Sequence, residues 1–202
     1  MSIDTVVFDI GNVLIEWDPR HLYREYFGDQ EALMEDFLAT VCTPAWNLEQ
    51  DRGRTWKEAV AVLTAEYPDC TELIRAYDER WCDMVVGEIP GTPELLAELK
   101  ERGVPLYALS NFSTEKFEES RERFPFFDEF DGRVLSGEVG LVKPDPAIFR
   151  CLVQRFGLDL ARTLYIDDLA ENVAVAESLG LVTHHFTGAA KLRADLEARG
   201  LL

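Results

Sequence analysis

The sequence predicts an α/β protein, and the pattern of apolar residues carries this prediction. In residues 1–16 and 88–202, short apolar runs alternate with stretches whose apolar residues have helical spacing. Strands that alternate with helices in this way form βαβ units and a mostly parallel sheet. Residues 17–87 show helical spacing alone. We therefore expect a Rossmann-like parallel-sheet core formed by 1–16 and 88–202, with 17–87 inserted as an all-helical unit.

Five apolar runs are the expected strands of the core. They are TVVFDI (5–10), PLYALS (105–110), GRVLSG (132–137), TLYIDD (163–168) and LVTHHF (181–186). The expected helices are 93–102, 113–124, 145–156 and 170–179. Gly103, Gly157 and Gly180 directly follow three of these helices, at the place where a glycine commonly ends a helix.

The inserted unit contains three stretches with helical spacing of apolar residues. They are PRHLYREYFGDQEALMEDFLATV, TWKEAVAVLTAEYP and CTELIRAYDERWCDMVV. No strand pattern interrupts them, so we expect their tryptophans and leucines to pack as a small helical bundle.

Length and composition limit the class of protein. The chain has 202 residues, 47% of them hydrophobic, which fits one large domain or a domain with an insertion. It has no apolar run of about 18 residues, so we expect no membrane span. Residues 1–8 lack the features of a signal peptide. Four scattered cysteines without metal-ligand spacing predict reduced thiols and a cytoplasmic location.

The formal net charge of −18 argues against nucleic acid and anionic membranes as partners. It also restricts the substrate. If the substrate is an anion, a metal ion or a few placed basic side chains must supply positive charge locally.

Polar side chains follow several of the expected strands. They are Asp9 after the first run, Ser110 and Asn111 after the second, Asp167 and Asp168 after the fourth, and Lys143 within GLVKPDP. Each alone could serve a turn, cap a helix or lie in solvent. Ligands of open α/β sheets bind at the carboxyl ends of the strands. The joint occurrence of these groups at one edge therefore favours a site.

The chemistry of these groups fits phosphoryl transfer. Carboxylates gathered at one edge repel each other unless a cation neutralises them, and Mg²⁺ binds carboxylates, a backbone carbonyl, waters and a phosphate oxygen. A carboxylate such as Asp9 can also attack phosphorus and form an aspartyl-phosphate. The transferred group then needs hydrogen-bond donors and a cation, and Ser110, Asn111 and Lys143 are groups of the right kind.

Four motifs of the chain resemble those of the haloacid dehalogenase-like (HAD) hydrolase superfamily. They are FDIGNVL, LSNFS, GLVKPDPAIF and YIDDLAENVAVAESLG, in the superfamily's order and at the expected strand ends. The resemblance covers the whole chain. The inserted unit, 17–87, resembles the helical cap that closes over the site in this superfamily. The implied fold is an α/β, Rossmann-like parallel-sheet core with an inserted all-helical cap.

The resemblance implies a role for each catalytic residue. Asp9 would be the nucleophile, Ser110 would bind the phosphoryl oxygens, and Lys143 would steady both the nucleophile and the phosphoryl charge. FDIGNV also resembles a branch that contains sugar-phosphate phosphatases, so a small phosphorylated metabolite is the implied substrate.

The resemblance also implies the metal site. Mg²⁺ would be held by Asp9, the backbone carbonyl of Gly11 and Asp168, with Asp167 beside it. Asn172 falls where the motif often has a second acid that orients the metal's waters.

One position departs from the pattern of the superfamily's phosphatases. They usually carry an aspartate two residues after the nucleophile, which protonates the leaving group, and this chain has Gly11 there. General acid–base help is worth about 10²–10⁴ in rate. Residues 46–53, WNLEQDRG, are the candidate source of a substitute, because Glu49, Asp51 and Arg52 lie together. Arg52 is also an expected substrate contact.

Two other functions remain open from the sequence. A metal-independent 2-haloacid dehalogenase would use Asp9 to attack carbon, and halide needs no proton to leave. Against this, Asp167 and Asp168 would place negative charge beside an anionic substrate. A domain that binds a phosphorylated ligand without turnover is the third hypothesis. The sequence leaves a homodimer open as well.

Overall fold

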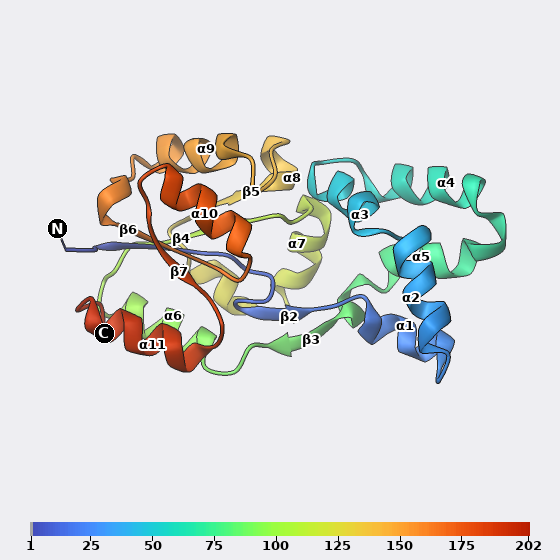
Figure 1. The fold of residues 1–202 in the computed structure, drawn as a ribbon, viewed down its shortest axis with the longest axis horizontal. Coiled ribbons are helices and arrows are strands. Elements are labelled where there is room, and N and C mark those ends of the chain that lie inside the picture. The colour runs from blue at the N-terminus through green and yellow to red at the C-terminus, as the bar shows by residue number, and fades with distance from the viewer. Residues whose placement is uncertain (1) are drawn as a thin grey trace.

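The computed structural model describes residues 2–202, and a five-stranded parallel sheet forms its centre (Figure 1). The strands, in spatial order, are β5 (Gly132–Leu135), β4 (Leu106–Ser110), β1 (Thr5–Phe8), β6 (Thr163–Asp167) and β7 (Val182–His185). The five predicted strands all form. The chain first builds outward from β1 through β4 to β5, and then crosses to β6 on the other side. The carboxyl end of β1 is therefore the point where ligands of such sheets bind.

The central strand is buried on both faces, as its near-continuous apolar sequence requires. Val6 and Phe8 belong to one apolar cluster and Val7 to another, because successive strand residues point to opposite faces. Phe8 is level with Ala108 of β4 and Ile166 of β6. The residues that follow these three strands therefore lie at the same height along the sheet.

Helices cover both faces of the sheet, as the α/β class predicts (Figure 1). The first apolar cluster includes leucines of α6 (Thr92–Glu101) and α11 (Ala189–Ala198). The second includes residues of α9 (Pro146–Phe156) and α10 (Ala170–Ser178). The other core elements are α7 (Thr114–Arg121), α8 (Ser136–Val139) and the 3₁₀ turns η3 (Pro125–Glu129) and η4 (Leu160–Arg162). Helices α8 and α11 were not among the predicted elements. No helix among residues 2–202 has the length and apolar content that spanning a bilayer requires.

The inserted segment forms the helices at the right of Figure 1. They are α1 (Arg20–Phe27), α2 (Glu31–Thr40), α3 (Pro44–Asp51), α4 (Trp56–Glu66) and α5 (Thr71–Glu79), with the 3₁₀ turns η1 (Pro68–Cys70) and η2 (Trp81–Met84). Thr43 and Thr55 start α3 and α4, since each side chain accepts a backbone N–H of the first turn. Tyr23 packs against Phe37 and Tyr77 in the bundle interior, with ring centroids 5.0 and 6.1 Å apart.

Two short strands that the sequence analysis had not predicted join this cap to the core. Strand β2 (Ile15–Trp17) pairs antiparallel with β3 (Val85–Glu88), and the register shifts between Glu16 and Trp17. Helical structure ends at η2, before Val85, because β-branched residues and a glycine follow. The segment 17–87 is thus helical except at its two ends. There it forms a ribbon that connects the cap to the sheet.

Helix α7 of the core makes polar contacts with the cap. The indole Nε1 of Trp56 donates to the hydroxyl of Ser113, the residue that caps α7, at 2.9 Å. The Nζ of Lys116 lies 2.7 Å from Oδ1 of Asp78 in α5, and Lys116 is only 3% exposed. Cap and core are therefore docked against each other through buried hydrogen-bonded groups.

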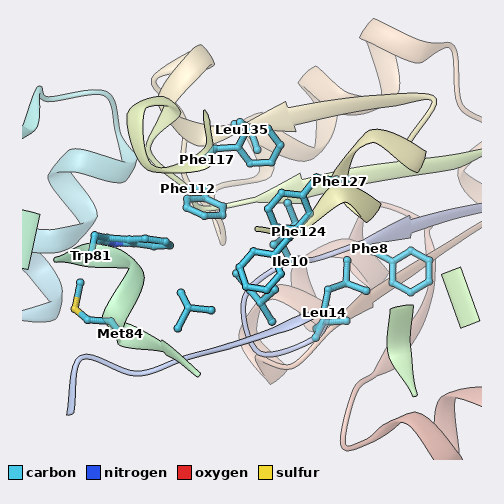
Figure 2. Close-up of a cluster of buried hydrophobic side chains, with 14 of the residues drawn as sticks. Phe8, Ile10, Leu14, Trp81, Met84, Phe112, Phe117, Phe124, Phe127 and Leu135 are labelled. Carbon is cyan, nitrogen blue, oxygen red and sulfur yellow. The ribbon is translucent and has the colours of Figure 1, made fainter. Parts of the chain in front are cut away.

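An apolar cluster continues from the sheet into this junction (Figure 2). Trp81 and Met84 of η2 lie on the cap side of the view, and Phe112 lies between them and the rings of Phe117 and Phe127. The rings of Trp81 and Phe112 have centroids 5.2 Å apart. The turn that follows β4 is thus packed directly against the cap.

Candidate active site

Asp9 lies at the carboxyl end of β1, where the backbone turns sharply. Its amide donates to the carbonyl of Ile166 at 2.9 Å, which continues the sheet pairing by one residue. Its Oδ1 accepts the amide of Ile10 at 2.7 Å. Asn12 then adopts φ +54°, a left-handed conformation that asparagine tolerates better than most residues, and its Oδ1 accepts the amide of Trp17. The turn therefore fixes the carboxylate of Asp9, which is 6% exposed.

Lys143 lies between two carboxylates. Its Nζ is 2.8 Å from Oδ2 of Asp9 and 2.7 Å from Oδ2 of Asp167. All three residues are buried, with Asp167 fully inaccessible. A buried cation of this kind is stable only when its charge is compensated in this way.

Asp167 is surrounded by hydrogen-bond donors. Besides Lys143, it accepts from the hydroxyl of Tyr165, from the amide of Leu169 at 2.8 Å, and from Nδ2 of Asn172 at 3.0 and 3.1 Å. These donors occupy the lone pairs of both oxygens. Tyr165 was not among the predicted site residues, although a residue two positions before Asp167 on a strand must share its face.

The buried charges shift each other's pKa. Burial raises the pKa of Asp9 to about 7, and the charge of Asp167 adds to this while Lys143 opposes it. For Asp167, burial acts in the same direction, but Lys143 and the hydrogen bonds outweigh it and the pKa is lowered. Burial alone would lower the pKa of Lys143, yet the two carboxylates raise it. Asp167 is therefore the carboxylate that Lys143 stabilises more strongly in the charged form, and Asp9 is the one that is more easily protonated.

Asp168 lies next to this group and is less buried. Carboxylate oxygens of Asp9, Asp167 and Asp168 all lie within 4.8 Å of one another. Burial raises the pKa of Asp168, and the charge of Asp167 raises it further. Hard divalent cations such as Mg²⁺ prefer oxygen donors gathered in this way. The donor set therefore fits the predicted metal, and Asp9 and Asp168 are its members with oxygen lone pairs to spare.

Ser110 and Asn111 follow β4 at the same edge, but they are placed differently. Ser110 is 2% exposed and lines the pocket described below. Asn111 also lines it, and both ends of its amide bond the backbone of Lys143: Oδ1 accepts from the amide at 2.8 Å, and Nδ2 donates to the carbonyl at 3.0 Å. Asn111 thus holds the loop that carries Lys143, a function that the sequence analysis had not assigned to it.

A pocket between core and cap opens beside these residues. It has a cavity volume of about 80 Å³ and is lined by Gly11, Ile15, Trp17, Asn47, Asp51, Trp81, Ser110, Asn111 and Phe112. The core contributes the turn after Asp9 and the end of β4. The ribbon, α3 and η2 contribute the rest. The pocket is therefore formed jointly by the sheet edge and the cap.

Of the acidic and basic residues in the stretch 46–53, only Asp51 lines this pocket. Arg52, an expected substrate contact, is exposed and lies 3.4 Å from Glu49 on the surface. Neighbouring residues on a helix point about 100° apart, so Asp51 and Arg52 face different surroundings. The structure brings together Asp9, Gly11, Ser110, Asn111, Lys143, Asp167 and Asp168, and leaves Arg52 outside.

Comparison with known proteins agrees with this geometry. The family model described as haloacid dehalogenase-like hydrolase matches residues 3–180. This chain is a haloacid dehalogenase-like hydrolase. The match confirms the resemblance found in the four motifs, and it covers the inserted segment and the core as far as residue 180.

Several relatives of this hydrolase are named phosphatases. The sesquiterpene phosphatase astK of Aspergillus oryzae is 26% identical over 198 residues, which cover 92% of this chain and 91% of the fungal protein. A glyceraldehyde 3-phosphate phosphatase of Methanocaldococcus jannaschii is 33% identical over 95 residues, or 46% of this chain and 42% of the archaeal protein.

The hydrolase also resembles a solved HAD family enzyme from Bacteroides thetaiotaomicron. The two are 26% identical with a TM-score of 0.75, over 93% of this chain and 95% of the bacterial one. Another structure of that enzyme, with a TM-score of 0.69, contains magnesium and inorganic phosphate. The two chains thus share one fold over nearly their whole lengths.

Proposed function

We propose that this hydrolase is a Mg²⁺-dependent phosphatase of a small phosphorylated metabolite. The observation that carries the proposal is the position of Asp9. It ends the central strand, touches Lys143 at 2.8 Å, and lies within 4.8 Å of two further carboxylates. An anion can approach this edge only when cations offset the acidic charge.

The nucleophile would be Oδ2 or Oδ1 of Asp9. Attack on phosphorus would form an aspartyl-phosphate and expel the alcohol, and water would then release phosphate. Lys143 would stabilise the charge on the phosphoryl oxygens, and Ser110 would donate a hydrogen bond to them. Gly11, in the turn that follows Asp9, lines the pocket, so a phosphate bound at this end of the pocket would lie next to the nucleophile.

Asp9, Asp168 and the carbonyl of Gly11 would hold the metal. When bound, Mg²⁺ would neutralise phosphate charge and lower the pKa of Asp9. Asp167 is a poorer ligand than its position suggests, because Lys143, Tyr165 and Asn172 already occupy its oxygens. We assign Asp167 to holding Lys143 instead.

The size of the pocket and the names of the relatives support a small-molecule substrate. A cavity volume of only about 80 Å³ suits a small leaving group rather than a macromolecule. Two relatives are named for the removal of phosphate from small molecules. A sugar phosphate is the leading candidate, in keeping with the motif FDIGNV.

The other predictions about partners and location stay predictions. The four cysteines are free, as expected for a reducing compartment, and a cytoplasmic location is the interpretation we retain. A homodimer is likewise retained as a hypothesis.

Hydrolysis of a panel of phosphate esters, with and without EDTA, tests the proposal. L-2-chloropropionate is assayed alongside for halide release. We expect phosphate release that stops in EDTA and returns with Mg²⁺, and no such activity in Asp9→Asn. Halide release that ignores EDTA would instead identify a dehalogenase. Ligand binding without turnover would identify a binding domain.

A further inference from the structure

Gly11 leaves an open space beside the nucleophile. Its backbone is not among those with positive φ, and a Cβ added there would meet no atom within 4 Å. A side chain would therefore fit at this position, and neither backbone conformation nor packing requires glycine. An alcohol expelled from phosphorus still needs a proton. The acid must come from another part of the pocket.

Asp51 is the one ionisable side chain among the residues that line the pocket with Gly11 and Ser110. It is the last residue of α3, at the junction of cap and core. The helix holds it by local contacts, since Nδ2 of Asn47, one turn earlier, donates to its Oδ2 at 3.0 Å. It forms no ion pair with any residue of the described part of the chain.

The surroundings of Asp51 suit a proton donor. Burial raises the pKa of Asp51 to about 7, and a backbone hydrogen bond from Ser113 lowers it only in part. A carboxyl group of this kind is protonated in a useful fraction of molecules near neutral pH and gives up its proton readily.

We infer that Asp51 is the general acid and base of this hydrolase, supplied by the cap in place of the aspartate missing at position 11. The inference rests on the proposed phosphatase function. As the bond from Asp9 to phosphorus forms and the ester P–O bond breaks, the proton of Asp51 moves to the departing alcohol oxygen. The resulting carboxylate then takes a proton from the water that attacks the aspartyl-phosphate. The bond between Asp9 and phosphorus breaks, phosphate leaves, and both Asp9 and Asp51 are restored.

Two further groups of the pocket indicate what kind of alcohol departs. Nε1 of Trp17 and Oδ1 of Asn47 are buried and have no hydrogen-bond partner within residues 2–202. Both residues line the pocket, whose other walls include the rings of Trp81 and Phe112. One group donates and the other accepts, so together they match hydroxyl groups. The leaving group is therefore a small alcohol that carries further hydroxyl groups. Its alkoxide is a poor leaving group unless an acid protonates it.

A comparison of two esters tests the role of Asp51. p-Nitrophenyl phosphate releases a stable phenolate that needs no proton, whereas glycerol phosphate or glucose 6-phosphate releases an alkoxide that does. We expect Asp51→Asn to lower kcat/KM for the alkyl ester about 10²–10⁴-fold. For p-nitrophenyl phosphate, kcat/KM should stay within about threefold, because this constant reports the steps up to loss of the leaving group.

Matched variants separate chemistry from folding. Glu66→Gln removes an exposed cap carboxylate from α4 and should leave kcat/KM for both esters unchanged. Gly11→Asp, added to Asp51→Asn, puts an acid into the open space. The double variant should have a kcat/KM for the alkyl ester at least tenfold above that of Asp51→Asn. If Asp51→Asn does not fold, Asp51→Ser replaces it, since its hydroxyl can still accept from Ser113.

The outcomes are distinct. A selective loss on the alkyl ester supports the inference. An equal loss on both esters in a folded variant, or no loss on either, overturns it. If wild-type enzyme hydrolyses neither ester, the proposed function itself fails. If Asp51→Asn retains Mg²⁺-dependent hydrolysis of p-nitrophenyl phosphate, the proposed function stands whatever the alkyl ester shows.

Discussion

The Nζ of Lys143 lies 2.8 Å from Oδ2 of Asp9, and both groups are almost completely shielded from solvent. The same nitrogen is 2.7 Å from Asp167, so one cation serves two carboxylates. The effect of this ion pair on stability and its proposed effect on activity can be measured separately.

Removal of Lys143 should lower both stability and activity. Lys143→Met leaves two buried carboxylates without their cation, and breaking a buried pair in this way costs about 3–5 kcal/mol. Without the positive charge of Lys143 beside the phosphoryl group, kcat should fall about 10²–10³-fold. Urea unfolding and phosphate release measure the two effects. Lys57→Met, which removes an exposed lysine of α4, is the control and should change neither.

The two adjacent aspartates should differ in their effect on the metal requirement. Asp168→Asn should raise the Mg²⁺ concentration needed for half-maximal activity about 10–100-fold. Asp167→Asn should mainly destabilise the fold, because Lys143 and Tyr165 lose a charged partner. A Mg²⁺ titration of activity, together with the thermal midpoint with and without Mg²⁺, distinguishes them. The assignment would be wrong if Asp167→Asn alone shifted the Mg²⁺ requirement.

Two ion pairs on helix α7 should contribute very different amounts to stability. Lys116 is 3% exposed and bonds Asp78 of the cap, so Lys116→Ala should cost about 1.5–3 kcal/mol. Arg121 pairs with Asp128 at the surface, and Arg121→Ala should cost about 1 kcal/mol or less. Chemical unfolding of both variants tests this, and equal losses would contradict a special role of the cap contact.

Asp51 should make folding stability depend on pH. Because burial raises its pKa to about 7, the folded protein binds this proton more tightly than the unfolded chain does. The contribution of Asp51 to stability therefore falls as pH rises from about 4 towards 7. An asparagine at position 51 does not titrate. The thermal midpoint of Asp51→Asn minus that of wild type should therefore be larger at pH 8 than at pH 5. A difference between the two proteins that does not change with pH would refute the expectation.

Much of the fold and the main site were predictable because strands and their ends leave a clear pattern. TVVF and TLYI are apolar runs with a carboxylate directly behind them, and parallel strands bring such ends to one edge. The sequence thus placed Asp9 and Asp167 together without any knowledge of distances.

The rest depended on contacts between residues far apart in the chain. The pairing of β2 with β3 joins segments about 70 residues apart, and each strand is too short to give a pattern of its own. The bonds from Asn111 to the backbone of Lys143 have no sequence signature. Asp51 and Arg52 are neighbours with similar polarity, and only the docking of α3 decides which of them reaches the pocket.

The β2–β3 ribbon has a mechanical consequence. The chain crosses between core and cap twice, and the two crossings are hydrogen-bonded to each other. Two unpaired linkers would let the cap rotate about several axes relative to the core, whereas a hydrogen-bonded ribbon bends chiefly about one axis. Ile15 and Trp17 of this ribbon line the pocket. Bending along that single degree of freedom would therefore carry Trp17 and Asp51 together, and would open and close the entrance for the substrate as one movement.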